Sequence, residues 1–396
     1  MKTDYDLVII GAGIHGAGVA QAAAAAGYSV LVLEQYSEAA KGTSSKSSKL
    51  IHGGLRYLET AQFKLVYECL RERSYLLKIA PHLVKLVPFH IPVFQKTTRR
   101  PWMIMLGLSI YTLFSGKFFN RISRSHWQEL DGLSTKGLDA VFSYCDAQTD
   151  DARLTRSVLA SAQELGADVI TCARFEHAHL CDDGCEIEYL KDDVLEKTTV
   201  KISAKIMINA AGAWANNVLE NIEPTPSRMD IELVQGTHII LPGDMRNLYY
   251  LESPQDRRAI FVMPWSASGK NHILVGTTEN IFIGDPAEVQ PLSSEVSYLL
   301  DVYNYYFSQQ LKPDDVIDVF AGLRVLPKGS GAVFGRSRDT SFWQDRSNRP
   351  RVITIYGGKL TSYRATAERL VRSLRGVLPG RERMADTRTL KLPVVK

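Results

Sequence analysis

Paired cysteines are scarce in this sequence. Five cysteines occur among 396 residues, an odd and scattered set at positions 69, 145, 172, 181 and 185. This distribution does not fit a disulfide framework and indicates a reducing compartment. Cys181 and Cys185 enclose Asp-Asp-Gly, which predicts the tip of a hairpin, because a metal site would need two more ligands at suitable spacing. We therefore predict no metal site.

The sequence also lacks a strong net charge, a membrane-spanning run and a signal peptide. The net charge of +4 is too small to indicate nucleic-acid binding. The apolar run at 101–114 is shorter than the roughly 20 residues that span a bilayer. Asp4 and Asp6 occupy the place of a positive leader region, and the following apolar run breaks at Gly11. We therefore predict a cytoplasmic location.

Acidic residues are absent from a long internal region. Between Arg73 and Gln128 there is no Asp or Glu, but there are nine Lys or Arg together with the apolar run. One interpretation is a buried helix beneath a basic face. The other is a peripheral patch on the inner face of the cytoplasmic membrane, whose apolar residues enter lipid. Its basic side chains would be Arg99, Arg100, Lys117, Arg121 and Arg124.

What the sequence does contain is a complete βαβ unit at its start. The composition, 45% hydrophobic and 23% charged, is that of a globular protein of about two domains. Residues 5–10 form an apolar run typical of a buried parallel strand. The glycine-rich turn at 11–16 follows, then an alanine-rich helix up to Gly27 and a second apolar strand at 29–33.

The turn carries the G-x-G-x-x-G pattern, which predicts dinucleotide binding. Gly11 permits the tight turn, Gly13 lets the backbone approach a pyrophosphate, and Gly16 lets the helix pack closely on the strand. The helix N-terminus offers N–H groups to phosphates. Glu34, at the end of the second strand, can accept hydrogen bonds from a ribose and disfavours a 2′-phosphate.

Three further segments favour FAD over NAD. Residues 42–50 supply five hydroxyl groups and two lysines, which could line a long cofactor's polar chain. Residues 204–215 form a strand that runs into small residues. Residues 352–370 run from a strand through glycines into a helix, whose N-terminus could face the flavin's pyrimidine end. A long cofactor contacted by both ends of the chain suits FAD.

Together these motifs resemble the FAD-dependent glycerol-3-phosphate dehydrogenases, within the D-amino-acid-oxidase-like flavoproteins. The resemblance runs from Asp6 to about Leu370, and its most specific motifs are "TSSKSSKLIHGGLRYLE" and "GGKLTSYR". The other motifs are "GAGIHGAG", "NAAGAW", "QGTHIILP", "ILVGTTE", "AGLRVLP" and "SRD".

The resemblance implies an α/β fold. A discontinuous Rossmann-like FAD-binding domain would comprise residues 1–85, 145–228 and 319–396, with a substrate- or membrane-facing insertion at 86–144. An antiparallel-sheet substrate domain would comprise 229–318, where three runs read as successive strands.

Three features depart from the family. His15 replaces a typical asparagine, and Ala213 replaces a usual proline. Bacterial members usually continue into a helical C-terminal domain of about a hundred residues, an ordinary domain size. This sequence stops at "TLKLPVVK", where that domain would begin, so we expect it to be absent. Many members of the family are dimers, but the expected absence of this domain leaves the oligomeric state of this chain undecided.

The resemblance further implies oxidation of sn-glycerol 3-phosphate to dihydroxyacetone phosphate, by hydride transfer from C2 to FAD. A dianionic phosphate requires cations, best as guanidinium groups. Arg56, Arg324 and Lys359 are the candidates, with Arg338 as an even choice between a ligand and a surface group. Tyr57 could add a phosphate hydrogen bond or simply pack.

A histidine is the predicted base. His238 matches a family histidine on a strand pattern, while His52 is the rival and is expected to hold the flavin or its loop; either could instead be a core histidine. The predicted catalytic set is His238, Arg324 and Lys359. The predicted FAD-binding set is Gly11, Gly13, Gly16, Glu34, Thr43, Ser44, Ser45, Ser48, Lys49, Leu50, His52, Gly53, Gly54, Ala211, Gly212, Gly358, Lys359, Leu360 and Thr361.

Electrons must leave the flavin again, and the family implies a membrane quinone as acceptor, or oxygen in some relatives. Two alternatives stay open. The first is an FAD-dependent oxidase of an amino or hydroxy acid, which would need an arginine and tyrosine clamp for a carboxylate instead of several cations. The second is a flavin-binding subunit without turnover.

Overall fold

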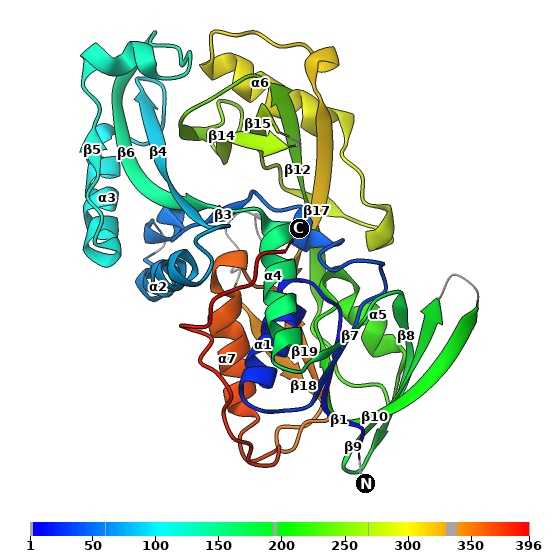
Figure 1. Cartoon of the computed structure of the whole chain (residues 1–396). Helices are drawn as coiled ribbons and strands as arrows, with labels where there is room; N and C mark the ends of the chain where they lie inside the picture. Colours follow the sequence, from blue (N-terminus) through cyan, green and yellow to red (C-terminus); the bar gives the residue numbers. More distant parts are fainter. Residues whose placement is uncertain (1–2, 60, 193–195, 268, 330–338, 396) are drawn as a thin grey trace.

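The computed structural model describes residues 3–59, 61–192, 196–267, 269–329 and 339–395. These residues form two large β-sheets, each covered by helices (Figure 1). The N-terminal strand lies in the first sheet, at the bottom of Figure 1, together with the last long helix of the chain. Segments distant in the sequence therefore build one domain.

The first sheet has a parallel centre in the order β19-β10-β1-β2-β7. The central strand β1 is mostly apolar because both faces of the sheet are covered there, and five of its six residues are buried. On one side the sheet continues through β9 and β8, which pair antiparallel, and then through β11, which is parallel to β8. Strand β18 pairs antiparallel with β19. The bounds are β1 Tyr5–Ile10, β2 Val30–Leu33, β7 Asp168–Ile170, β8 Ala173–Cys181, β9 Gly184–Asp192, β10 Lys197–Asn209, β11 Ile222–Glu223, β18 Ser341–Gln344 and β19 Val352–Tyr356.

Helices cover both faces of this sheet. Helices α1 (Ile14–Ala25), α4 (Asp151–Glu164) and α7 (Tyr363–Ser373) pack on one face against Leu7 and Ile9. Helix α5 (Ala215–Glu220) packs on the other. The alanine-rich sequence of α1 follows from this arrangement, because the helix is enclosed on nearly all sides by α4, α7 and the sheet.

The second sheet is antiparallel apart from the β13–β4 pair, in the order β16-β12-β15-β14-β13-β4-β6-β3. Strand β17 also pairs with β12, and β5 with β6. The bounds are β3 Leu50–Ile51, β4 Lys85–Phe94, β5 Asn120–Arg121, β6 Leu138–Gln148, β12 Ile231–Pro242, β13 Leu248–Glu252, β14 Ala259–Ala267, β15 Lys270–Gly276, β16 Asn280–Phe282 and β17 Asp318–Pro327. Helix α6 (Ser293–Tyr306) packs on one face, and α2 (Phe63–Ile79) and α3 (Pro101–Ser115) pack on the other.

Short 3-10 turns connect these elements and carry several predicted site residues. They are η1 Thr43–Ser45, η2 Leu55–Leu58, η3 Arg124–Glu129, η4 Gly212–Trp214, η5 Pro286–Glu288, η6 Pro313–Asp315 and η8 Leu360–Ser362. Within the described residues, η1, η2, η4 and η8 all lie near the junction of the two sheets.

The predicted fold class is confirmed: a discontinuous Rossmann-like FAD-binding domain stands beside an antiparallel-sheet domain. The predicted strands at 5–10 and 29–33 and the hairpin tip at Cys181 are found. The domain boundaries differ in two places. Strand β17 pairs with β12, so residues 318–327 belong to the second sheet, and β4 and β6 join the 86–144 insertion to that same sheet.

The apolar run at 101–114 forms α3, and five of its large apolar side chains are exposed. Only Ile104, Leu108 and Tyr111 are buried, whereas Trp102 is 62% and Leu113 is 80% exposed. The buried-helix interpretation is therefore wrong, because α3 lies at the outer edge of the molecule (Figure 1) with one face on the sheet. Among the described residues there is no helix with the length and apolarity to cross a membrane.

Candidate active site

A cavity of about 580 Å³ lies where the two sheets meet. Its walls come from the glycine-rich turn, from β2, from residues 40–57, from the loop after β10, from β12 and β17, and from residues 357–361. The predicted residues that line it are Gly11, Gly13, Glu34, Thr43, Ser44, Ser48, Leu50, His52, Gly54, Arg56, Tyr57, Ala211, Gly212, His238, Arg324, Gly358, Lys359, Leu360 and Thr361. Gly16, Ser45, Lys49 and Gly53 do not line it.

The glycine-rich turn is shaped by close backbone contacts. Gly11 has φ +99°, and a Cβ there would lie 3.0 Å from the carbonyl oxygen of Ala210. A Cβ on Gly16 would lie 1.8 Å from the carbonyl oxygen of Gly11, inside contact distance. Gly16 therefore acts by letting α1 approach β1, as predicted, although it does not reach the cavity.

Gly16→Ala is expected to displace the turn and reduce the FAD content of the purified protein by more than half, because a backbone atom occupies the Cβ position. The ratio of flavin to protein absorbance measures it. Gly107→Ala, inside α3 with nothing within 4 Å of its Cβ, is the matched control. It should keep the FAD and gain up to about 1 kcal/mol of stability. Full FAD content in Gly16→Ala would contradict the close-packing role.

Glu34 directly follows β2 at the cavity wall, and its carboxylate already accepts hydrogen bonds from the backbone. Its Oε2 accepts a hydrogen bond from the Ala12 N–H at 2.7 Å, and its Oε1 accepts one from the Tyr36 N–H at 3.0 Å. Burial raises the pKa of this carboxyl above its usual value, against those backbone hydrogen bonds. A carboxylate has about four acceptor sites, so this one could also accept from a ribose hydroxyl.

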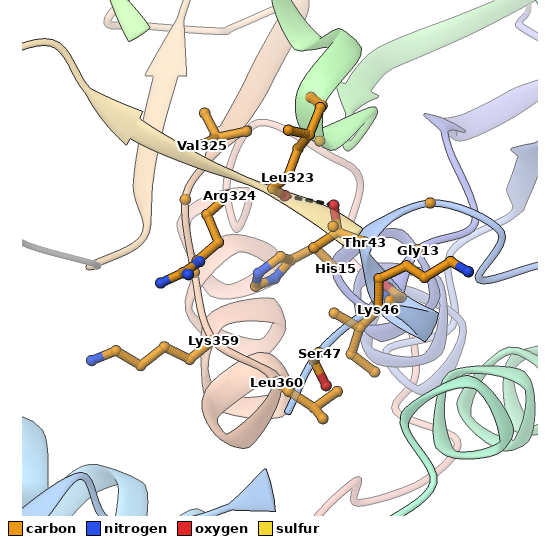
Figure 2. A pocket seen from close by; sticks show the side chains of 18 of the residues that line it. Gly13, His15, Thr43, Lys46, Ser47, Leu323, Arg324, Val325, Lys359 and Leu360 are labelled. Carbon is orange, nitrogen blue, oxygen red and sulfur yellow. Dashed lines mark hydrogen bonds between the residues drawn. The ribbon is translucent and has the colours of Figure 1, made fainter. Parts of the chain in front are cut away.

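The hydroxyl-rich loop at 42–50 uses several of its polar groups to hold the protein together. The Thr43 hydroxyl donates to the Leu323 carbonyl at 2.6 Å (Figure 2), and the Ser44 hydroxyl accepts from the Ile14 N–H at 2.9 Å. The Lys49 ammonium donates to Asp151 at 2.5 Å and is buried with it. Lys49 therefore contacts the start of α4, and its predicted contact with the cofactor stays a prediction.

The histidine and glycines at 52–54 are held from two sides. The Gly54 N–H donates to His52 Nδ1 at 3.1 Å, and the His52 N–H donates to the Thr361 hydroxyl at 3.2 Å. The Gly53 N–H donates to the Tyr111 hydroxyl at 2.9 Å, which ties this loop to α3. Because Nδ1 of His52 accepts a hydrogen bond, the neutral form of the ring carries its proton on Nε2.

Cationic side chains gather at one end of the cavity. Arg324 and Lys359 extend in the same direction in Figure 2, and Arg56 and Tyr57 line the cavity from η2. The Lys359 ammonium is buried, and its Nζ lies 4.2 Å from the centre of the Tyr57 ring. It has no hydrogen-bond acceptor among the described residues. A buried ammonium without an acceptor indicates a place for an anion. Arg338 lies outside the described residues.

Arg324 differs from Lys359 because its guanidinium is already oriented. One nitrogen donates to Glu279 at 2.5 Å and another donates to the Thr278 carbonyl at 2.9 Å. Sequence reasoning did not single out Glu279 as a site residue, although it ends the "ILVGTTE" motif. The cavity-lining Lys46 and His15 were likewise not predicted as ligands.

His238 projects from β12 into the cavity wall and is 2% exposed. Its Nε2 lies 2.9 Å from the Ser48 hydroxyl, its ring stacks on Phe320 at 4.9 Å, and its Nδ1 has no partner among the described residues. Burial, with smaller contributions from Lys49 and Arg324, lowers the pKa of His238 to about 3. The imidazole is therefore neutral at pH 7.

This low pKa predicts an acid-dependent loss of stability. Below a pH of about 6.5 the histidine binds a proton in the unfolded chain but stays neutral in the folded protein. The stability that the neutral His238 contributes is therefore complete above pH 6.5 and is lost as the pH falls towards 3. His238→Asn should remove about 1–2 kcal/mol of the fall in unfolding free energy between pH 7.5 and 5. Urea unfolding at both pH values measures it. An identical fall in wild type and variant would refute the buried neutral histidine.

The cavity has the features that a bound FAD requires. Its volume is in the range of cofactor pockets, and the N-terminus of the 12-residue α1 opens onto it through Gly13 and Ile14. Three buried nitrogen atoms of cavity-lining residues, on His15, His238 and Lys359, lack hydrogen-bond partners among the described residues. Residues 6–371 match the family model described as FAD dependent oxidoreductase. The chain belongs to this family.

Relatives extend the match over most of the chain. The aerobic glycerol-3-phosphate dehydrogenase of Escherichia coli is 37% identical over 93% of this chain and 73% of its own length. The D-erythritol 1-phosphate dehydrogenase of Brucella abortus is 35% identical over 94% and 74%. The structure of the glycerol-3-phosphate dehydrogenase from Bacillus halodurans, complexed with FAD, is 27% identical, with a TM-score of 0.75 over 99% of this chain and 68% of that one.

These comparisons confirm the predicted family, the FAD-dependent glycerol-3-phosphate dehydrogenases. This FAD-dependent oxidoreductase therefore uses FAD as its cofactor, as predicted. The individual site residues stay predictions, supported by the cavity that gathers most of them.

Proposed function

We propose that this FAD-dependent oxidoreductase oxidises sn-glycerol 3-phosphate at C2 and releases dihydroxyacetone phosphate. The observation that carries the proposal is the cation cluster of Arg56, Arg324 and Lys359 in the same cavity as a neutral histidine. Several cations suit a phosphate dianion better than a single carboxylate. The relatives named for glycerol 3-phosphate support the same substrate.

The phosphate would lie between Lys359 and Arg324. Lys359 supplies a buried ammonium that needs an acceptor, and Arg324 supplies the N–H groups that Glu279 and Thr278 leave available. Arg56 and Tyr57 would close the same end from η2. If these groups hold the phosphate, they also fix the position of the substrate's C2 relative to β12.

His238 would accept the C2 hydroxyl proton. Its ring is neutral, and it lies in the cavity wall beside Ser48. His52 suits this task less well, because its Nδ1 already accepts from Gly54 and its Nε2 carries a proton. A substrate phosphate would also offset the charge of Arg324, one of the two cations that lower the pKa of His238.

When bound, FAD would supply the hydride acceptor. Around it, Gly11, Gly13 and the start of α1 would hold the pyrophosphate, and Glu34 would hold a ribose. Gly358, Leu360 and Thr361 would enclose the flavin from the C-terminal side of the chain.

Anaerobic mixing with a panel of substrates tests the proposal and its rivals. sn-Glycerol 3-phosphate should bleach the flavin absorbance fastest at limiting concentration. D-erythritol 1-phosphate is the second candidate substrate, because the Brucella relative is named as its dehydrogenase. If it bleached the flavin faster than sn-glycerol 3-phosphate, the substrate would be a longer polyol phosphate. Bleaching only by glycine or lactate would instead indicate an acid oxidase, and no bleaching would indicate a subunit without turnover.

We also propose that α3 docks on an anionic membrane surface, where a quinone would take the electrons. Support comes from the exposed Trp102, Leu106 and Leu113 beside a region without acidic residues. Replacing these three by serine should lower co-sedimentation with anionic liposomes at least fivefold and leave bleaching by glycerol 3-phosphate unchanged. Ile281, Ile283 and Leu292, exposed elsewhere, are the matched triple control. Unchanged binding of the α3 variant would remove the proposal.

A further inference from the structure

Glu295 is a buried carboxylate that accepts an unusual number of hydrogen bonds. It lies in the first turn of α6 and is 2% exposed. Its Oε2 accepts from Gln235 Nε2 and from the Thr237 hydroxyl, both at 2.6 Å, and from the Leu292 N–H at 3.1 Å. Its Oε1 accepts from the Thr278 hydroxyl at 2.7 Å and from Asn280 Nδ2 at 2.6 Å.

These hydrogen bonds keep Glu295 ionised. Burial alone would raise its pKa, but the bonds from Thr237, Thr278, Leu292 and Asn280 outweigh burial and bring the pKa below its ordinary value. A buried carboxylate with five donors is a rigid centre, because losing any one donor leaves charge without compensation.

The donors lie directly behind the substrate end of the cavity. Gln235 and Thr237 occupy β12, and successive residues of a strand point to opposite faces, so His238 faces the cavity while Thr237 faces Glu295. The Thr237 N–H also donates to the Thr278 hydroxyl at 2.8 Å. One carboxylate thus connects the back of β12 to residues 278–280.

Residues 278–280 hold Arg324. Glu295 binds the side chains of Thr278 and Asn280, and Glu279 between them binds the Arg324 guanidinium. The Thr278 carbonyl accepts from the same guanidinium. A Cβ on Gly236 would lie 2.7 Å from an Arg324 nitrogen, so the guanidinium rests closely on β12.

We propose that Glu295 is a positioning residue, which fixes residues 278–280 so that Glu279 presents Arg324 to the substrate's phosphate. The proposal deepens the proposed function and rests on it for the identity of the substrate. Glu295 itself does not line the cavity. Its effect would pass through Glu279 and Arg324, and it should therefore change anion affinity more than the rate of the chemical step.

The test uses the FAD-loaded protein and two readouts. Titration with inorganic phosphate, followed by the flavin absorbance, gives a dissociation constant for the anion. Anaerobic mixing with sn-glycerol 3-phosphate gives a half-saturating concentration and a limiting rate. Glu295→Gln should raise both the dissociation constant and the half-saturating concentration at least tenfold, and change the limiting rate less than threefold. Glu288→Gln, an exposed acid before α6, is the control and should change neither.

A double-mutant cycle separates positioning from general support of the fold. If Glu295 acts through Glu279, adding Glu295→Gln to Glu279→Gln should weaken phosphate binding by less than twofold more. The proposal would be overturned if the effects of the two substitutions on the dissociation constant multiplied in the double variant. It would also be overturned if Glu295→Gln left the phosphate affinity unchanged. Should Glu295→Gln fail to fold, Asn280→Ala removes one donor at an exposed position and should still weaken phosphate binding about threefold; an unchanged affinity there would overturn it equally.

The readouts also separate this proposal from the proposed function. Wild-type protein that binds phosphate but is not bleached by sn-glycerol 3-phosphate would contradict the proposed substrate, while the phosphate titrations would still decide the role of Glu295. Wild-type protein that does not bind phosphate would contradict both.

Discussion

Replacing Lys359 by methionine is expected to lower kcat/KM for sn-glycerol 3-phosphate by about 10²–10³-fold, because truncating one partner of a buried charge pair costs about 3–4 kcal/mol. Methionine keeps most of the side-chain volume, so the loss reports the charge. The ammonium is buried and has no acceptor among the described residues, and the substrate phosphate would supply one. Steady-state kinetics with an artificial electron acceptor measure the change.

Lys136→Met, at an exposed position, is the matched control and should retain wild-type kinetics. Lys359→Met should keep its FAD, because the predicted cofactor contacts at Gly358, Leu360 and Thr361 do not depend on the ammonium. A loss of less than tenfold with FAD retained would place the phosphate elsewhere in the cavity.

Replacing His238 by asparagine is expected to slow flavin reduction by about 10²–10⁴-fold, the usual contribution of a general base. Asparagine can still hydrogen-bond Ser48, but it cannot take a proton at neutral pH. The substrate concentration at half-saturation should change little, because His238 is not among the predicted phosphate ligands. Anaerobic rapid mixing separates the two quantities.

His52→Asn is the comparison that decides between the two histidines. Its Nδ1 accepts from Gly54, a bond that an asparagine oxygen could replace, so the limiting rate should fall less than tenfold. A larger loss in His52→Asn than in His238→Asn would assign the base to His52 and would contradict the account given above.

The sequence predicted the cofactor half of the molecule well, because its signals are local. The turn from Gly11 to Gly16 follows β1 and opens α1 within one continuous segment. Steric requirements of that turn act between neighbours, so glycine spacing alone reveals them. Three strands of the second sheet, β12, β14 and β15, were also recognisable from their composition.

Partners of the charged groups could not be predicted in the same way. Lys49 and Asp151 are far apart in the sequence, and so are Arg324 and Glu279, yet each pair is in direct contact. Folding brings such pairs together through sheet pairing that no local pattern records. For the same reason Asp151 was not predicted as the partner of Lys49, and Glu279 was not predicted at all.

Helix α3 shows a further limit of composition. An apolar run without charges is compatible with burial and with exposure, since periodicity alone does not show what covers a helix. Here the chain covers only the face that contains Ile104, Leu108 and Tyr111.

The most direct test of the central claim is a single turnover of the FAD-loaded protein with sn-glycerol 3-phosphate deuterated at C2, mixed without oxygen. If C2 gives up a hydride beside His238 and Lys359, the flavin absorbance will bleach. The deuterated substrate will bleach it severalfold more slowly than the unlabelled substrate. Dihydroxyacetone phosphate will form in an amount equal to the flavin. A flavin that keeps its absorbance, or equal rates for the two substrates, would contradict the claim.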